Sequence, residues 1–262
     1  VYWVDEPEVK DYPTVLNGFK NIRAAVPDLN CMLTEQVEPG LVGGPSIWCP
    51  LTPSFKQDLA NERMAQGDRF WWYVCTVPKA PYVTEMIDHP GTEMRVWLWQ
   101  TWQRRIDGVL IWATTYWTCG NAYPDPAHRQ NPYEDPMSWM SGYGTKPGEK
   151  RPWGNGDGRL IYPPERAADG NPTEPIFEPP VDTIRIEMLR DGIEDFEYLT
   201  MLRMLVESKK DKVSAEELAR YNALMEIPKD ITVDVTHFTT DPAPIERHRE
   251  AVAHAIEILS KL

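Results

Sequence analysis

The stretch VYWVDEPEV, residues 1 to 9, decides how the rest of the chain is interpreted. An apolar, aromatic run of strand length ends abruptly in two adjacent carboxylates, Asp5 and Glu6, and Pro7 follows them directly. In folds where parallel strands alternate with helices, catalytic groups lie at the carboxyl ends of the strands. The pattern therefore predicts a strand that presents two acids to a reaction site. A helix N-cap at Asp5 is the structural alternative, but Pro7 and the delay before Thr14 fit it poorly.

The two acids indicate a type of reaction, and their adjacency raises a geometric difficulty. A pair of carboxylates is the usual equipment for cleaving a glycosidic bond, with one donating a proton to the leaving oxygen and the other acting at the anomeric carbon. Neighbours on a strand point to opposite faces, so Asp5 and Glu6 reach one pocket only if the chain turns where the strand ends. Pro7 indicates such a turn.

Downstream of the acids, buried strand-like runs alternate with amphipathic helical patterns. The expected strands are YWVDE at 2–6, CMLTE at 31–35, SIWCP at 46–50, RFWWYVC at 69–75 and GVLIWATTYW at 108–117. The expected helices lie at 14–30, 54–67, 92–106, 182–211, 214–226 and 243–262. This alternation is typical of a parallel sheet covered by helices, either an open doubly wound sheet or a (β/α) barrel. Since a closed barrel needs eight strands, the five expected here make a partial one.

Two further features concern binding. Residues 118–182 are rich in Gly, Pro, Asn and Trp and predict a long loop with a short strand near RLIYP, and such length without regular structure usually indicates function. The expected strand ends are rich in aromatic side chains, which stack on sugar rings or, alternatively, fill a core. The aromatic residues in question are Trp48, Trp71, Trp72, Tyr73, Trp112, Tyr116 and Trp117.

Composition excludes several classes of function. The 262 residues are 42% hydrophobic, enough for a sizeable core, and no apolar run approaches the roughly 18 residues of a membrane span. A formal net charge of −13 disfavours nucleic acid as a partner. The four cysteines and five histidines show no metal-ligand spacing, so we expect no metal and no cofactor.

Five blocks of sequence carry a family resemblance. They are WVDEP at 3–7, WWYVCTVP at 71–78, DGVLIWATTYW at 107–117, NGDGRLIYPP at 155–164 and IRIEMLRDGIEDFEYL at 184–199. Together they resemble glycoside hydrolase family 123 and its relatives in domain-of-unknown-function family 4091. The resemblance runs from the first residue to about residue 203, and the last two blocks are long enough to be specific.

The resemblance implies a (β/α)8 barrel that cleaves β-linked N-acetylgalactosamine by substrate-assisted, retaining catalysis. Glu6 would then be the general acid, and Asp5 would orient the 2-acetamido group, whose carbonyl oxygen attacks the anomeric carbon. With the nucleophile on the substrate, the usual carboxylate separations need not hold. The partner would be a glycan or glycolipid, and the resemblance implies a periplasmic or secreted bacterial enzyme. We expect substrate contacts from Glu35, Tyr73, Trp112, Tyr116, Trp117 and Asp157.

Some alternatives stay open at this point. The block containing Asp157, NGDG, is also an ordinary tight-turn sequence. If the first strand is the fourth of a barrel, residues 1–203 are the C-terminal portion of that barrel and residues 204–262 a helical extension packed on it. The N-terminal half of the barrel would then be missing. A glycosidase of other specificity and a non-catalytic sugar-binding remnant are the competing functions.

Overall fold

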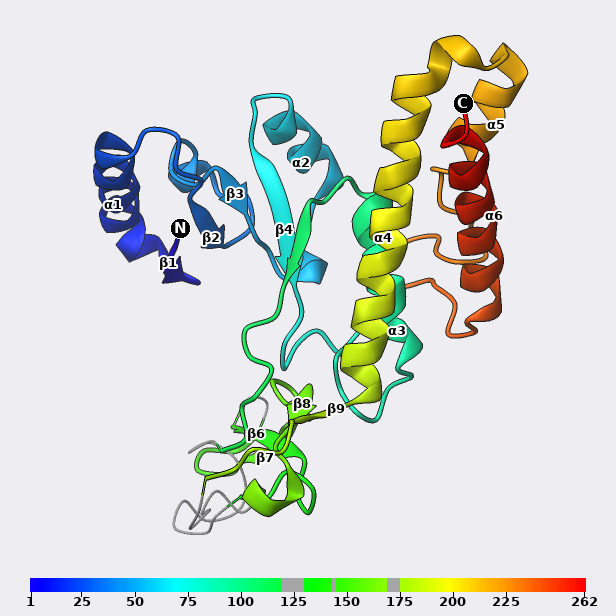
Figure 1. Cartoon of the computed structure of the whole chain (residues 1–262). Helices are drawn as coiled ribbons and strands as arrows, with labels where there is room; N and C mark the ends of the chain where they lie inside the picture. Colours follow the sequence, from blue (N-terminus) through cyan, green and yellow to red (C-terminus); the bar gives the residue numbers. More distant parts are fainter. Residues whose placement is uncertain (119–129, 143–144, 169–174) are drawn as a thin grey trace.

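The computed structural model describes residues 1–118, 130–142, 145–168 and 175–262, and its central feature is a five-stranded parallel sheet. Each strand lies beside the one that precedes it in the chain, in the order β1-β2-β3-β4-β5 (Figure 1). The strands are β1 (Tyr2–Asp5), β2 (Met32–Thr34), β3 (Ile47–Trp48), β4 (Arg69–Tyr73) and β5 (Gly108–Leu110). All five expected strands are therefore confirmed, and each is shorter than its apolar run because the chain leaves the sheet early.

Three helices follow strands of this sheet, as the alternation predicts. They are α1 (Tyr12–Ala25), α2 (Gln57–Met64) and α3 (Thr92–Gln103), whereas β2 and β3 are joined by a short 3-10 turn at Pro39–Leu41. Val15 and Phe19, four residues apart on α1, are both buried against the sheet. The core beneath these helices includes Leu33, Trp48 and Trp72.

A second core joins three more helices to α3. These are α4 (Ile184–Lys209), α5 (Ala215–Ala223) and α6 (Ala243–Leu259), and Figure 1 shows α5 and α6 beside the long helix α4. Trp97 of α3 belongs to the core under the sheet, while Trp99 belongs to the core among these C-terminal helices. A buried ion pair between Arg95 Nε and Asp195 Oδ2, at 2.6 Å, also ties α3 to α4. The division expected after residue 203 falls inside α4.

Two antiparallel ribbons fill much of the stretch expected to be a long loop. One pairs β6 (Met137–Ser141) with β7 (Arg151–Asn155), and the other pairs β8 (Ile161–Tyr162) with β9 (Val181–Asp182). The short strand expected near RLIYP is β8. In Figure 1 the segment from β6 to β9 lies beyond the ends of β4 and β5, where the arrows of those strands point.

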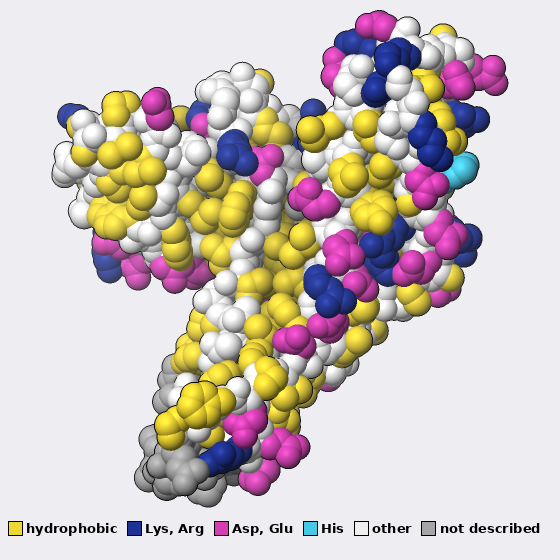
Figure 2. All heavy atoms as spheres, viewed as in Figure 1, with side chains coloured by type: hydrophobic (Ala, Val, Ile, Leu, Met, Phe, Trp, Pro, Cys, Tyr) yellow, Lys and Arg dark blue, Asp and Glu magenta, His cyan; other side chains and the backbone are white. Residues whose placement is uncertain are grey.

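The face of the molecule drawn in Figure 2 differs in character between its two halves. Figure 2 shows acidic and basic side chains gathered over the C-terminal helices, whereas hydrophobic side chains are more prominent between the sheet and the β6–β9 segment. Among the described residues, no helix combines the length and apolarity that crossing a bilayer requires.

Candidate active site

A pocket of about 620 Å³ lies at the carboxyl edge of the sheet. It is formed where β1, β2, β4 and β5 end, together with residues from the β6–β7 segment and the turn after it. Its lining comprises Tyr2, Asp5, Glu6, Thr34, Tyr73, Cys75, Thr76, Leu110, Ile111, Trp112, Trp139 and Asp157. Of the eight expected site residues, five therefore share one pocket: Asp5, Glu6, Tyr73, Trp112 and Asp157.

Asp5 and Glu6 line the same pocket because the chain turns sharply at the end of β1. Glu6 has a φ of 39°, in the left-handed region that a residue with a side chain rarely adopts. Pro7 behind it is buried, which fixes the direction in which the chain leaves. The turn required by the paired acids is therefore present, at a backbone position whose strain is typical of functional sites.

Thr34, the last residue of β2, holds this turn in place. Its hydroxyl donates to Asp5 Oδ1 at 2.8 Å and accepts the backbone N–H of Glu6 at 3.1 Å. The phenol of Tyr2 also donates to Asp5 Oδ1, and burial together with this bond raises the pKa of Tyr2 to about 12. Both hydroxyl donors thus reach the same oxygen of Asp5, which leaves Oδ2 without a donor among the described residues.

Glu6 accepts a hydrogen bond from a different tyrosine. The phenol of Tyr73, the last residue of β4, donates to Glu6 Oε1. Burial, and then the hydrogen bond and charge of Glu6, raise the pKa of Tyr73 above the ordinary phenol value. Tyr73 is therefore a neutral donor throughout the working range of an enzyme, and it orients the acid without adding charge.

An aromatic wall stands on the side of the pocket formed after β5. Trp112 is 41% exposed, and its ring lies 4.8 Å from the ring of Tyr116 and 6.5 Å from that of Trp139, edge to face in both pairs. Indole Nε1 of Trp112 donates to Asp157 Oδ1 at 3.0 Å. The wall is apolar, is fixed at one point by a carboxylate, and suits the C–H face of a sugar ring.

The Gly-Asp-Gly turn that carries Asp157 is closely packed. Both flanking glycines have positive φ, 82° at Gly156 and 69° at Gly158. A Cβ at Gly156 would lie 2.9 Å from the Arg185 guanidinium, and one at Gly158 would lie 2.9 Å from the Trp112 ring. The tight-turn and ligand-site interpretations of NGDG are therefore both compatible with the structure, because the turn places Asp157 against the pocket.

Two buried arginines organise the same turn. The guanidinium of Arg185, in the first turn of α4, donates to the backbone carbonyls of Glu85, Gly156 and Arg159. Arg159 in turn donates to the carbonyls of Tyr116, Asp135 and Trp117. The IRIEMLRDG block thus acts at the site through Arg185, which binds backbone carbonyls.

The remaining expected contacts lie outside this pocket. Glu35 follows β2 and is partly buried. Burial raises the pKa of its carboxyl group, and the nearby charges of Glu38 and Glu6 act in the same direction. A backbone hydrogen bond from Gln36 opposes this shift. The Tyr116 ring packs edge to face against that of Trp112, and Trp117 donates its indole N–H to the carbonyl of Ile161 at 2.7 Å. The aromatic residues noted at the expected strand ends do not all reach the pocket, because Trp48 and Trp72 are fully buried in the core.

Sequence reasoning missed Tyr2, Thr34 and Trp139 as pocket residues. Thr34 ends an expected strand, and the strand-end criterion that selected Asp5 and Glu6 could have found it. Tyr2 precedes Asp5 by three residues and reaches back only because the chain turns. Trp139 stands in a stretch without periodicity, so no pattern marked it.

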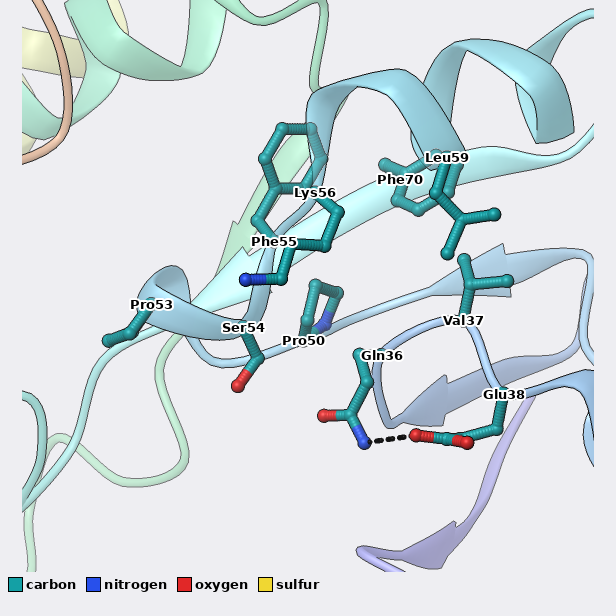
Figure 3. Close-up of a pocket in the computed structure, with 10 residues that line it drawn as sticks. All are labelled: Gln36, Val37, Glu38, Pro50, Pro53, Ser54, Phe55, Lys56, Leu59 and Phe70. Atoms are coloured by element: carbon teal, nitrogen blue, oxygen red, sulfur yellow. Dashed lines mark hydrogen bonds between the residues drawn. The ribbon is translucent and has the colours of Figure 1, made fainter.

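A second hollow, of about 490 Å³, lies beside α2 (Figure 3). It is lined by residues that follow β2 and β3, by Leu59 of α2 and by Phe70 of β4. Its one acid, Glu38, accepts a hydrogen bond from the Gln36 amide at 2.8 Å. Because this hollow lacks a second acid and an exposed tryptophan, the pocket at Asp5 and Glu6 is the better candidate for chemistry.

Metal ligands do not cluster in the parts of the chain that the structure describes. Cys31, Cys49 and Cys75 are all free thiols there, and Cys119 lies outside the described residues.

Paired acids in an aromatic pocket at the carboxyl edge of a parallel sheet are typical of glycoside hydrolases. Comparison with known families agrees, since the catalytic domain of glycoside hydrolase 123 matches residues 5–202. The chain belongs to glycoside hydrolase family 123. The family resemblance expected from the sequence is confirmed.

A solved structure supports the fold. A family 123 glycoside hydrolase from Clostridium perfringens, studied for glycolipid glycan hydrolysis, superposes with a TM-score of 0.63 at 16% identity. The similarity covers 99% of this chain and 41% of that one, so the chain spans less than half the length of this relative. A search of curated proteins finds no match.

Proposed function

We propose that the chain is the acid-bearing part of a retaining β-N-acetylhexosaminidase that removes N-acetylgalactosamine by substrate-assisted catalysis. The observation that carries the proposal is that Asp5 and Glu6, adjacent in the chain, both line one pocket. In a substrate-assisted reaction the nucleophile is the acetamido oxygen, so the two acids act at neighbouring points of one sugar ring. Adjacent residues suit that geometry, whereas a separate enzyme nucleophile would face the acid across the ring.

Each acid has a role that its hydrogen bonds favour. Glu6, held at Oε1 by Tyr73, protonates the departing glycosidic oxygen and then takes a proton from the incoming water. Asp5 is held at Oδ1 by Tyr2 and Thr34, and its Oδ2 accepts the N–H of the acetamido group. As the oxazolinium-like ring forms and becomes positive, the negative charge of Asp5 stabilises it.

The rest of the pocket supplies binding. Trp112 and Trp139 offer an apolar wall to the sugar ring, and Tyr73 and Asp157 offer polar atoms to its hydroxyls. Glu35 and Trp117 lie outside the pocket, so they contact only a ligand that extends beyond one sugar. A glycan or glycolipid is such a ligand, and glycolipid glycans are what the Clostridium perfringens study concerns.

We further propose that the five strands are strands 4 to 8 of a (β/α)8 barrel whose first half lies elsewhere in a longer polypeptide. The strands follow one another in parallel order, and Tyr2 and Trp3 of the edge strand β1 are 49% and 43% exposed. Strands from the missing half would pair with that edge and cover these rings. In this arrangement residues 204–262 form a helical extension packed on the barrel.

The proposed function is tested with the full-length polypeptide and a set of nitrophenyl β-glycosides. We expect cleavage of the N-acetylgalactosaminide, weaker or comparable cleavage of the N-acetylglucosaminide, and none of the galactoside, which lacks the acetamido nucleophile. The first sugar product, followed by NMR, should be the β anomer. Cleavage of the galactoside at a similar rate would rule out substrate assistance, and no cleavage of any glycoside would favour a non-catalytic sugar-binding protein.

A further inference from the structure

A second pair of carboxyl groups lies directly behind the aromatic wall. Glu85, in the segment between β4 and α3, is completely buried, and neither of its carboxyl oxygens accepts a hydrogen bond from any N–H or O–H among the described residues. Asp157 is 1% exposed and lines the pocket, yet its Oδ2 likewise has no such donor. Three buried carboxyl oxygens in one place thus have no conventional donor, which in a native fold calls for an explanation.

The position of the two carboxyl groups relative to each other bears on this explanation. Glu85 and Asp157 lie side by side, since one guanidinium nitrogen of Arg185 donates to the carbonyls of both Glu85 and Gly156, and the charge of Asp157 acts on Glu85. A carboxylate cannot donate a hydrogen bond. Two bare carboxylates side by side in a dry interior would repel, and neither would recover its lost hydration. A single proton held between them removes the repulsion and gives a donor to an oxygen that otherwise lacks one.

Charges around the pair favour one proton and not two. Arg185 on α4 and Lys79 in the loop after β4 face the pair, but both donate to backbone carbonyls, Arg185 to those of Glu85 and Gly156 and Lys79 to that of Trp153. The Cys75 thiol also lies nearby. Burial, and then the hydrogen bond and charge of Asp157, raise the pKa of Glu85 well above its usual range, while Arg185 opposes the shift.

Asp157 passes the effect of this proton to the pocket. Its Oδ1 accepts the indole N–H of Trp112 at 3.0 Å, and the Trp112 ring is the exposed part of the aromatic wall. The flanking glycines have positive φ and Arg185 donates to the carbonyl of Gly156, which hold the backbone of the turn, and the Asp157 side chain is buried there.

We propose that Glu85 and Asp157 share one proton and together act as a positioning pair that holds Trp112 in the orientation required for ligand binding. While the proton is held, Oδ1 of Asp157 stays in place to accept the indole N–H. When the proton is lost, two buried charges face each other and the turn relaxes, which releases Trp112. The proton pair belongs to the fold itself, and its consequence for a sugar ligand rests on the proposed function.

The shared proton is tested by infrared spectroscopy at neutral pH, where exposed carboxyls are ionised. We expect a protonated-carboxyl band in the wild-type protein that is lost in Glu85→Gln, since glutamine supplies an N–H donor of similar shape without a titrating proton. Glu93→Gln is the matched control, because Glu93 is also buried in this region but accepts the Thr84 N–H at 2.9 Å. A band that persists unchanged in Glu85→Gln overturns the shared proton.

The positioning of Trp112 is tested by fluorine NMR of protein labelled with 5-fluorotryptophan. The Trp112 resonance is assigned by its absence in Trp112→Phe, and we expect it to shift with pH at the midpoint where the infrared band disappears. Because both signals come from the wild-type protein, the comparison does not depend on a variant that folds. A Trp112 resonance that is indifferent to that transition overturns the positioning role.

The consequence for ligand is measured on the full-length enzyme. The KM for an aryl N-acetylhexosaminide should rise several-fold across the same transition in the wild type and stay level in Glu85→Gln. An equal rise in both overturns the link between the pair and binding. If no glycoside is cleaved at all, the proposed function fails. The infrared and fluorine signals still decide whether Glu85 and Asp157 share a proton and position Trp112.

Discussion

The phenol of Tyr73 at the end of β4 donates a hydrogen bond to Glu6, which follows the end of β1. Two strands, β2 and β3, lie between β1 and β4 in the sheet. On a flat sheet three strand spacings would separate the two strand ends by about 14 Å. The contact therefore fits a sheet that curves at its carboxyl edge around the pocket.

Tyr73→Phe should lower kcat by about 10- to 100-fold, because a hydrogen bond to a charged group contributes about 1.5 to 3 kcal/mol. Tyr2→Phe is the matched control, since it removes the equivalent phenol from Asp5. The two variants should differ in kind: Tyr73→Phe should be more harmful with poor leaving groups, and Tyr2→Phe equally harmful with all. The same leaving-group dependence in both variants would contradict separate roles for the two acids.

Glu6→Gln should lower turnover most for substrates with poor leaving groups. Protonation of the departing oxygen is what a general acid supplies, and its loss costs roughly 10²- to 10⁴-fold when the leaving group needs the proton. A dinitrophenyl glycoside leaves readily without protonation and should lose far less. Rates compared across aryl glycosides of graded leaving-group acidity measure the difference, and equal losses would remove Glu6 from the acid role.

The fold was more predictable from the sequence than the site was. The runs around Leu33 and Trp72 are apolar and bounded by turn residues, so five strands and their helices could be placed. The same runs could not show which aromatic side chain faces the pocket. A parallel sheet is buried on both faces, so its strands lack the alternation that marks an exposed side, and Trp72 proved to be core while Tyr73 lines the pocket.

Some acids of the site could be predicted from the sequence and others could not. Asp5 and Glu6 could be found because they end a strand, and Asp157 because it sits between glycines. Glu85 could not, since an acid in an irregular segment is usually solvated. Its burial depends on how residues far apart in the chain come together, above all Arg185 and the turn at Asp157.

Asp195→Asn should destabilise the fold by about 3 kcal/mol, because it removes the charge that pairs with Arg95 in the interior. Asp195 is 1% exposed and also accepts the indole N–H of Trp99 at 2.9 Å. Glu194→Gln, next to it on α4, is the control, since the Glu194 side chain is 48% exposed and its pairing with Arg249 should contribute less than about 1 kcal/mol. Urea denaturation followed by circular dichroism measures the free energy of unfolding of both variants. Similar decreases would mean that the buried ion pair contributes no more to stability than the exposed one.

Asp5→Asn tests the substrate-assisted mechanism most directly. The variant keeps the size of the side chain and loses its charge, which matters most as positive charge develops on the oxazolinium-like ring. We expect a lower kcat with little change in KM, equivalent to about 3 to 4 kcal/mol. A thiazoline analogue of the intermediate should bind the full-length enzyme tightly and this variant weakly. If Asp5 is instead an ordinary nucleophile, a 2-deoxy-2-fluoro glycoside should form a covalent ester on it. Mass spectrometry that finds this adduct on Asp5, together with indifference to the thiazoline, would overturn substrate assistance while leaving glycoside cleavage as the activity.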